Sequence, residues 1–151
     1  MALSKADIDY DQDYNLWIEQ TVELLKAHRF DEIDLENLIA ELESMSKRDK
    51  RELLSRFKVL LMHLLKWQYQ PDKRSNSWRS SIRNNRAEIT QIIEDSPSLK
   101  VFPSAILDKA YRFARADAAD ETGLDLADFP IECLFTADQA LDTEFWPESK
   151  L

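Results

Sequence analysis

Apolar residues recur along most of the chain at intervals of three or four positions, and strict alternation of apolar and polar residues is rare. That spacing places the apolar side chains on one face of an α-helix, whereas alternation would indicate a β-strand. Five stretches carry such a stripe: residues 14–25, 35–45, 53–69, 78–93 and 107–118. The pattern therefore predicts an all-α fold, a single-domain helical bundle of five main helices plus one or two short C-terminal helices.

Local signals predict where several of these helices begin and end. Asp11 is an expected N-cap of the first helix, and Ser46-Lys-Arg-Asp49 has the spacing of a capping box that would start the third. Pro71 should end the third helix, and Gly123 should close the fifth in a left-handed conformation. Thr136-Ala-Asp-Gln139 has capping-box spacing for a short last helix.

The third stretch is apolar on more than one side. Its main face carries Leu53, Phe57, Leu60, Leu61 and Leu64. Val59 and Met62 lie on the opposite side. A helix with apolar residues on opposite sides is packed from several directions. We therefore expect this helix at the centre of the bundle, antiparallel to the fourth.

The length of 151 residues suits one domain, with a short N-terminal arm over residues 1–10. Cys133 is the only cysteine, which excludes an internal disulfide and any metal motif built on cysteine pairs. The first residues are acidic and polar, and no apolar run is long enough to span a bilayer. These features predict a cytoplasmic protein without a membrane segment, and no motif indicates a cofactor or a metal.

The formal net charge of −9 conceals three segments of different sign. Residues 1–46 carry 3 basic and 12 acidic side chains, residues 47–86 carry 12 and 3, and residues 87–151 carry 5 and 14. The acidic flanks could neutralise the basic segment within the fold, through exposed ion pairs that each contribute little. Alternatively, the basic residues gather on one exposed face that attracts an anionic partner.

Short landmarks occur in order along nearly the whole chain: Tyr10, Trp17, Leu35-Glu-Asn-Leu38, His63-Leu-Leu-Lys-Trp67, Ser77-Trp78, Arg86, Ser96-Pro-Ser-Leu99, Ala110-Tyr111, Glu121-Thr-Gly-Leu124 and Trp146-Pro147. Together they resemble the bacterial "domain of unknown function 29" family. The resemblance implies a single all-helical cytosolic domain, and it implies no established activity, cofactor or catalytic residue. Members of that family often have proline after the position of Cys133, where this chain has Leu134, so the backbone there is expected to differ locally.

Helical phase places two charged residues, Arg86 and Glu121, on faces that should be buried. A buried charge without a partner is costly, so each should find an opposite charge or a set of hydrogen bonds. The favoured interpretation is that they form a structural ion pair between the fourth and fifth helices. One alternative is a polar pocket, with His63 as a further candidate, in which Arg86 binds an anionic ligand. Another is that one of the two side chains extends its charged end into water. If the two residues pair, the losses from replacing each of them should not be additive.

His63 also invites a metal or acid–base interpretation, because the histidine pKa lies near neutrality. However, zinc sites of the HExxH type need two histidines one helical turn apart, and His28 belongs to a different predicted helix. A hydrogen-bonded structural histidine is therefore favoured. Glu41 and Glu43 flank the apolar face of the second helix and could reach a shared site.

Aromatic and basic residues surround the predicted turn between the third and fourth helices. The candidate anion or nucleic-acid surface consists of Lys66, Lys73, Arg74, Arg79 and Arg83. Bases stack on aromatic rings while phosphates pair with lysine and arginine, so Trp67 and Trp78 beside these cations suit nucleic acid. They suit the packed end of a hairpin as well, and the helical phase of both rings favours packing.

Three functions follow from these alternatives. A non-enzymatic protein-interaction module is favoured, because packing and partner recognition explain the unusual residues better than any catalytic arrangement. Nucleic-acid association through the basic 47–86 hairpin is second. A small-molecule or enzymatic pocket around Arg86 and Glu121 is third, and it requires a well-formed concave cavity that holds these groups.

Overall fold

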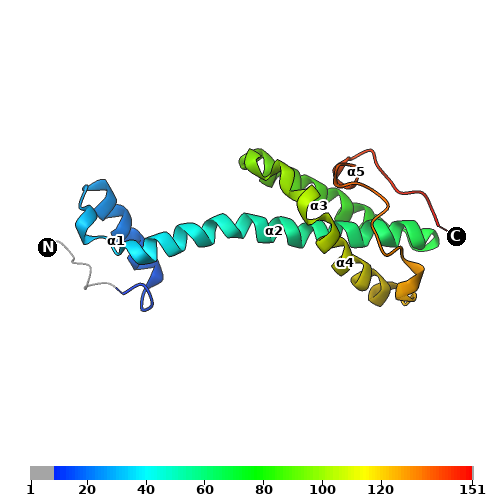
Figure 1. Cartoon of the computed structure of the whole chain (residues 1–151), viewed down its shortest axis with the longest axis horizontal. Coiled ribbons are helices and arrows are strands. Elements are labelled where there is room, and N and C mark those ends of the chain that lie inside the picture. The colour runs from blue at the N-terminus through cyan, green and yellow to red at the C-terminus, as the bar shows by residue number, and fades with distance from the viewer. Residues whose placement is uncertain (1–8, 151) are drawn as a thin grey trace. The chain divides into compact units, whose positions relative to one another are not determined.

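The computed structural model describes residues 9–150, so the predicted N-terminal arm of residues 1–10 lies almost entirely outside the described residues. The described chain is all-α, as predicted, and its regular elements are α-helices and short 3₁₀ turns (Figure 1). The α-helices are α1 (Tyr14–Lys26), α2 (Leu35–Tyr69), α3 (Asn76–Asp95), α4 (Phe102–Thr122) and α5 (Ala137–Leu141). The 3₁₀ turns are η1 (Phe30–Glu32), η2 (Pro71–Lys73), η3 (Pro97–Val101) and η4 (Leu126–Asp128).

The chain divides into two compact units, residues 1–47 and residues 48–151, and the boundary falls within α2. The second unit contains the large hydrophobic core, to which α2, α3, α4 and the segment around α5 contribute. The expectation of one single domain stays a prediction.

The predicted second and third helices are in fact one helix. We expected a new helix to start at Ser46, but α2 continues without interruption from Leu35 to Tyr69. A capping box stabilises a helix start only where the preceding backbone leaves amides unpaired. Neither proline nor glycine occurs between residues 35 and 69, so nothing in this stretch interrupts the backbone hydrogen bonds of the helix.

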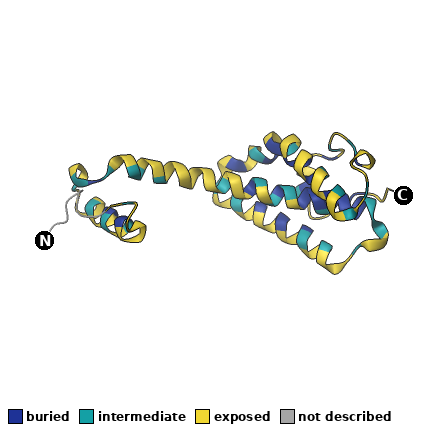
Figure 2. Cartoon of the chain, turned by 90° about the horizontal axis from the view of Figure 1, so that it is seen from below, coloured by how far each residue is buried: buried dark blue, intermediate teal, exposed yellow. Residues whose placement is uncertain are grey.

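The predicted core of residues 48–151 is confirmed. Leu53, Phe57, Leu60, Leu61 and Leu64 are all fully buried. On the far side of the helix, Met62 is buried while Val59 is partly exposed. Buried residues lie on the inward sides of the packed helices in Figure 2.

The predicted antiparallel pair is present between the C-terminal part of α2 and α3 (Figure 1). Ser81 Oγ lies 3.4 Å from His63 Nδ1, and Arg56 Nη2 lies 3.9 Å from Glu88 Oε2. From the first contact to the second, the residue number increases along α3 and decreases along α2. The two helices therefore run antiparallel.

Most helix ends lie where the sequence signals place them. Pro71 opens the short turn that follows α2, and Gly123 ends α4 with a left-handed φ of 73°. Thr136 and Gln139 form the predicted capping box of α5. The first N-cap is Asp13 instead of Asp11, because the Asp13 carboxylate accepts the Leu16 amide.

Residues 1–47 form a smaller unit in which α1 packs near η1 and the first turns of α2. Its most buried apolar side chains are Trp17 and Ile33. The Glu41 carboxylate accepts hydrogen bonds from the phenols of Tyr10 and Tyr14, the latter at 2.6 Å. The bond to Glu41 raises the pKa of Tyr10 to about 12. Glu41 thus connects α2 to α1 and to the turn before it.

Replacing Ser46 with alanine distinguishes a continuous helix from a capped helix start. In an exposed helix interior alanine is favoured over serine, so we expect Ser46→Ala to raise the free energy of unfolding by up to about 0.5 kcal/mol. Urea unfolding followed by circular dichroism measures the change. The matched control is Thr136→Ala, which removes a true capping hydroxyl and should cost about 1 kcal/mol. A loss of similar size at Ser46 would contradict the continuous helix.

Candidate functional site

Arg86 is buried in α3, as helical phase predicted, with 2% of its surface exposed. Its Nε donates to the carbonyl oxygen of Ala140 at 2.8 Å, and its Nη2 donates to that of Phe145 at 2.7 Å. The guanidinium carbon lies 5.4 Å from the centre of the Trp146 ring. Burial lowers the pKa of Arg86, and the charge of Asp142 raises it by less. Arg86 therefore holds the segment from α5 to Trp146 against α3.

The expected pairing of Arg86 with Glu121 is wrong. The Glu121 side chain is 48% exposed, and its carboxylate accepts a hydrogen bond from Lys66 Nζ at 2.6 Å. Ala118, one turn earlier, is fully buried, but α4 ends at Thr122. Because the last turn lies at the end of the packed region, a residue in phase with the core stripe still reaches water there.

His63 is half-buried and hydrogen-bonded within its own helix. Its Nδ1 donates to the carbonyl oxygen of Val59 at 2.9 Å. Burial lowers the pKa of His63, and the positive charge of Lys66 lowers it further, while the Val59 carbonyl and Glu121 oppose this shift. These contacts fit a structural histidine. Among the described contacts none joins Arg86 to His63 or to Glu121, so the three candidate residues do not form one site.

The predicted anion surface is largely engaged in contacts within the fold. Lys66 is buried, and its ammonium lies 4.7 Å from the centre of the Trp78 ring. The guanidinium of Arg74 lies 4.6 Å from the Trp67 ring, and that of Arg79 lies 5.7 Å from it. Stacking of a base on these ring faces would have to displace the protein's own cations. The contacts therefore favour the packed hairpin end over a nucleic-acid surface.

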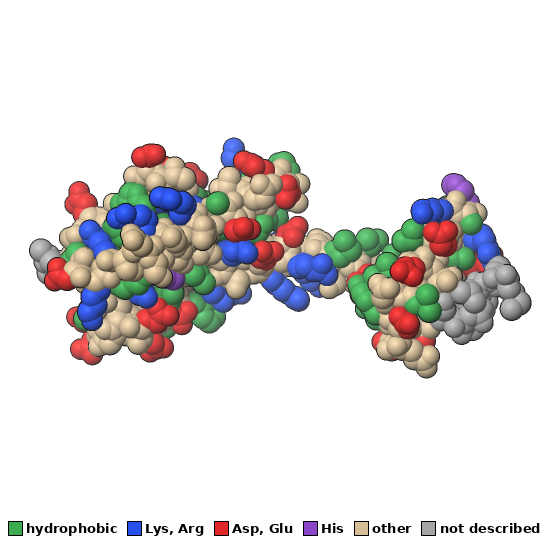
Figure 3. Space-filling model, turned by 180° about the vertical axis from the view of Figure 1, so that it is seen from behind, with side chains coloured by type: hydrophobic (Ala, Val, Ile, Leu, Met, Phe, Trp, Pro, Cys, Tyr) green, Lys and Arg blue, Asp and Glu red, His purple; other side chains and the backbone are tan. Residues whose placement is uncertain are grey.

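The remaining two members of that surface, Lys73 and Arg83, are exposed. Figure 3 shows basic and acidic side chains interspersed on the visible face of residues 48–151. On this face basic side chains are thus mixed with acidic ones.

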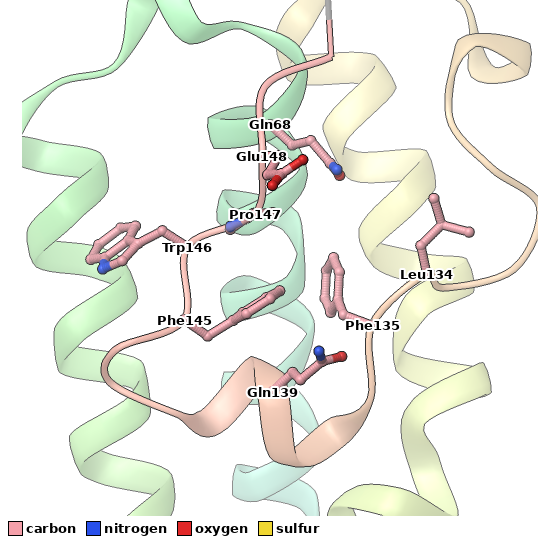
Figure 4. Close-up of a pocket in the computed structure, with 8 residues that line it drawn as sticks. All are labelled: Gln68, Leu134, Phe135, Gln139, Phe145, Trp146, Pro147 and Glu148. Carbon is pink, nitrogen blue, oxygen red and sulfur yellow. The ribbon is translucent and has the colours of Figure 1, made fainter.

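A pocket of about 310 Å³ lies under the C-terminal segment (Figure 4). It is lined by Gln68, Leu134, Phe135, Gln139, Phe145, Trp146, Pro147 and Glu148. Phe135 and Phe145 lie side by side, with ring centres 5.6 Å apart, while the Trp146 ring points to the opposite side of the segment (Figure 4). The Lys150 amide donates to the Gln68 carbonyl at 2.8 Å, and Arg74 Nη2 donates to Ser149 Oγ at 2.8 Å. The C-terminal segment that covers the pocket is therefore held in place by hydrogen bonds to Gln68 and Arg74.

Tyr111 and Cys133, whose side chains have raised pKa values, lie near Pro130 in the segment between α4 and α5. Burial raises the pKa of Tyr111, whose hydroxyl donates to the Pro130 carbonyl at 2.6 Å. Burial also raises the pKa of the Cys133 thiol to about 11. A thiol with this pKa stays protonated at neutral pH, so Cys133 is a poor nucleophile and a packing residue.

Residues 1–47 contain an apolar groove that is absent from the sequence-based predictions. It lies between α1 and the first turns of α2 and has a volume of about 150 Å³. It is lined by Tyr14, Trp17, Ile18, Thr21, Val22, Leu25, Leu38, Glu41, Leu42 and Met45. Trp17 and Thr21 are buried in it, whereas Leu42 and Met45 are 56% and 52% exposed. The apolar stripes of the two helices were visible in the sequence, but a stripe predicts a buried face without showing whether anything covers it.

The polar groups that line this groove are already engaged. Thr21 Oγ1 donates to the Trp17 carbonyl at 2.7 Å, and Glu41 accepts the two tyrosine hydroxyls. The groove therefore presents almost only apolar surface, so it favours a ligand with an apolar side. Its polar groups are engaged in hydrogen bonds and are not available for acid–base chemistry.

A family model for "domain of unknown function DUF29" matches residues 10–146, nearly the whole chain. The chain belongs to this family. The match extends from Tyr10, which hydrogen-bonds Glu41, to Trp146, which packs on Arg86 and on Trp67 at 4.6 Å. Leu134, at which the sequence analysis expected a departure from the family, is 64% exposed and lies at the surface.

Neither the curated proteins nor the solved structures compared with this chain give a match. Within residues 9–150, no three side chains of histidine, cysteine, aspartate or glutamate cluster as metal ligands would. No described helix combines the length and the apolar character needed to cross a membrane. The family membership leaves function to be inferred from the surfaces described above.

A double-mutant cycle tests the separate roles of Arg86 and Glu121. Arg86→Met leaves the buried carbonyl of Ala140 and the partly buried carbonyl of Phe145 without this donor, and we expect it to cost roughly 2–4 kcal/mol of unfolding free energy. Glu121→Gln weakens a half-exposed pair and should cost less than about 1 kcal/mol. Urea unfolding should show that the two losses add within about 0.5 kcal/mol. The Lys66→Met and Glu121→Gln pair is the control, since these residues are in contact and should couple.

The lowered pKa of His63 makes stability depend on pH. The unfolded chain, with a histidine pKa of about 6.5, binds the proton more readily than the folded chain. The stability due to neutral His63 is therefore complete above about pH 6.5 and is lost as the pH falls toward the lower folded pKa. Unfolding free energies of the wild type and of His63→Gln between about pH 5 and 7.5 measure the difference. We expect a smaller loss on acidification in the variant, and equal losses would contradict the assignment.

Proposed function

We propose that the protein is a non-enzymatic protein-interaction module that acts through the apolar groove of residues 14–45. The observation that carries this proposal is the exposure of large apolar side chains along two neighbouring helices. Tyr14, Val22, Leu25, Leu42 and Met45 line the groove, and each is between 39% and 56% exposed. Contiguous exposed apolar side chains support a binding role, because such surface is common at sites of protein interaction.

The shape of the groove supports a helical partner. Its lining on α1 extends from Tyr14 to Leu25, which is three turns of helix or about 16 Å. Side chains that repeat every three or four residues form ridges, into which the ridges of another helix fit. A third helix laid along the groove would cover the exposed residues and complete a three-helix arrangement.

The acidic charge of residues 1–46 supports a basic partner. The exposed Glu19, Glu23, Glu36 and Glu43 on α1 and α2 do not line the groove, so they attract a basic partner through their summed field and not through direct contact. Residues 1–46 as a whole carry 12 acidic and 3 basic side chains. Complementary charge speeds encounter and selects among partners. The proposed occupant is therefore an amphipathic helix with an apolar stripe flanked by lysine or arginine.

The cytoplasmic location and nucleic-acid binding remain predictions from the sequence. We expect the protein to be cytoplasmic, in keeping with its single cysteine. Nucleic-acid binding through residues 47–86 is less well supported, because the rings of Trp67 and Trp78 are in contact with the protein's own cations.

Two synthetic amphipathic peptides of about 15 residues test the groove. Both carry leucine at every third or fourth position, and one has lysine and the other glutamate at the flanking positions. Isothermal titration calorimetry should detect binding of the lysine peptide and much weaker binding of the glutamate peptide. We expect Leu42→Gln to weaken binding about tenfold, because a leucine contact is lost.

The matched control is Leu35→Gln, on the same helix. Leu35 is 58% exposed, close to the 56% of Leu42, but it does not line the groove. This variant should bind the lysine peptide as the wild type does. Equal losses in the two variants, or no binding of either peptide, would contradict the proposal. If instead the protein dimerises and Leu42→Gln abolishes the dimer, a second copy is the occupant.

A further inference from the structure

The charge of Arg86 is buried without a carboxylate in contact with it. Its two hydrogen bonds to described residues both go to neutral carbonyls, those of Ala140 and Phe145. Asp142 is the acidic residue that acts on it electrostatically, but an Asp142 oxygen already accepts the Glu144 amide at 2.9 Å. The lowered pKa of Arg86 shows that burial outweighs this charge. The guanidinium therefore has neutral carbonyls as its direct partners, and Asp142 offsets its charge only from a distance.

The Arg86 guanidinium also has N–H donors that are not hydrogen-bonded to the described residues. Nε and Nη2 are used, whereas Nη1 makes no hydrogen bond to any residue between 9 and 150. No buried side-chain nitrogen or oxygen of the described residues lacks a partner, so Nη1 must be reachable by solvent. An arginine has five N–H donors in a planar fork, which matches the oxygens of a phosphate or a carboxylate.

A pocket opens beside this guanidinium. Its volume is about 270 Å³, and it is lined by Arg83, Arg86, Thr143 and Trp146. Arg83 precedes Arg86 by three positions on α3, which places the two side chains on neighbouring positions of one helix face. Arg83 is exposed and makes no ion pair with any described residue. Thr143 adds a hydroxyl that is able to donate a hydrogen bond.

We propose that this pocket binds a phosphate group of a small molecule, which Arg86 contacts from its buried end and Arg83 contacts from the open end. Two cations and a hydroxyl around one cavity match the charge and the several acceptor oxygens of a phosphate. The volume lies below the usual range for drug-sized ligands, so the ligand is small. The site is independent of the groove of residues 14–45 and of the function proposed for it.

Inorganic phosphate and glycerol phosphate are the probes, titrated into the full chain at low ionic strength. Isothermal titration calorimetry measures affinity, and two-dimensional ¹H–¹⁵N NMR locates the site through the Trp146 indole and the Thr143 amide. We expect saturable binding with shifts centred on these two residues. Tighter binding of one probe tells a free anion from a phosphate ester. Sodium chloride at matched ionic strength should not reproduce the shifts, because it supplies no multivalent oxyanion.

Arg83→Gln is the decisive variant, because Arg83 is exposed and its loss should leave the fold intact. We expect it to weaken phosphate binding at least about fivefold. Arg79→Gln removes the same charge one turn earlier on α3, outside the pocket, and should bind as the wild type does. The proposal is overturned by the absence of binding up to about 10 mM phosphate. It is also overturned by equal losses in the two variants, or by chemical-shift changes away from the pocket.

Discussion

The buried guanidinium of Arg86 is the constraint on which the architecture of residues 48–151 depends. An arginine that is removed from water must have its donors satisfied, or the fold loses several kcal/mol. In this protein the acceptors are the carbonyls of Ala140 and Phe145, which follow Arg86 in sequence by 54 and 59 residues. One side chain thus fixes both α5 and the extended segment after it. The pocket of Figure 4 lies under that segment, and the Trp146 ring lies against the same guanidinium.

The two compact units satisfy their apolar surfaces in different ways. In residues 48–151 the α2 stripe is covered by α3, α4 and the C-terminal segment, and its leucines are fully buried. In residues 1–47 the equivalent stripes of α1 and α2 leave Leu42 and Met45 half exposed in a groove. Full burial of a large apolar side chain stabilises a protein by roughly 1.5–3 kcal/mol compared with leaving it in water. A partner that covers the groove gains part of this free energy, which is the physical reason to associate the unit with binding.

Local patterns were sufficient for the fold class and insufficient for the contacts of the candidate site. The stripe at Leu53 to Leu64, the stop at Pro71 and the left-handed Gly123 all depend on nearby residues, and the structure confirms them. Helical phase also predicted that Arg86 is buried, since this depends only on the face of α3. Its partners were not predictable, because they are backbone carbonyls, of Ala140 in α5 and of Phe145 after it, and a carbonyl leaves no signature in the side-chain sequence.

The errors have the same origin. The capping-box spacing at Ser46 is a local signal that the uninterrupted hydrogen bonding of α2 overrides. Glu121 was in phase with a buried stripe, but phase does not reveal that the packed region ends at the last turn of α4. In the same way, the stripes of residues 14–25 and 35–45 indicated apolar faces and not whether this chain covers them.

The protection of the Arg86 Nε–H from exchange with water tests the central claim most directly. Its signal is observable by ¹H–¹⁵N NMR at neutral pH, and Arg83 on the same helix is an internal exposed reference. Because the Arg86 Nε–H donates to a buried carbonyl, we predict slow exchange, close to that of core backbone amides. Exchange as fast as that of Arg83 would show that the Nε–H is open to water and is not bonded to Ala140, and would contradict the account.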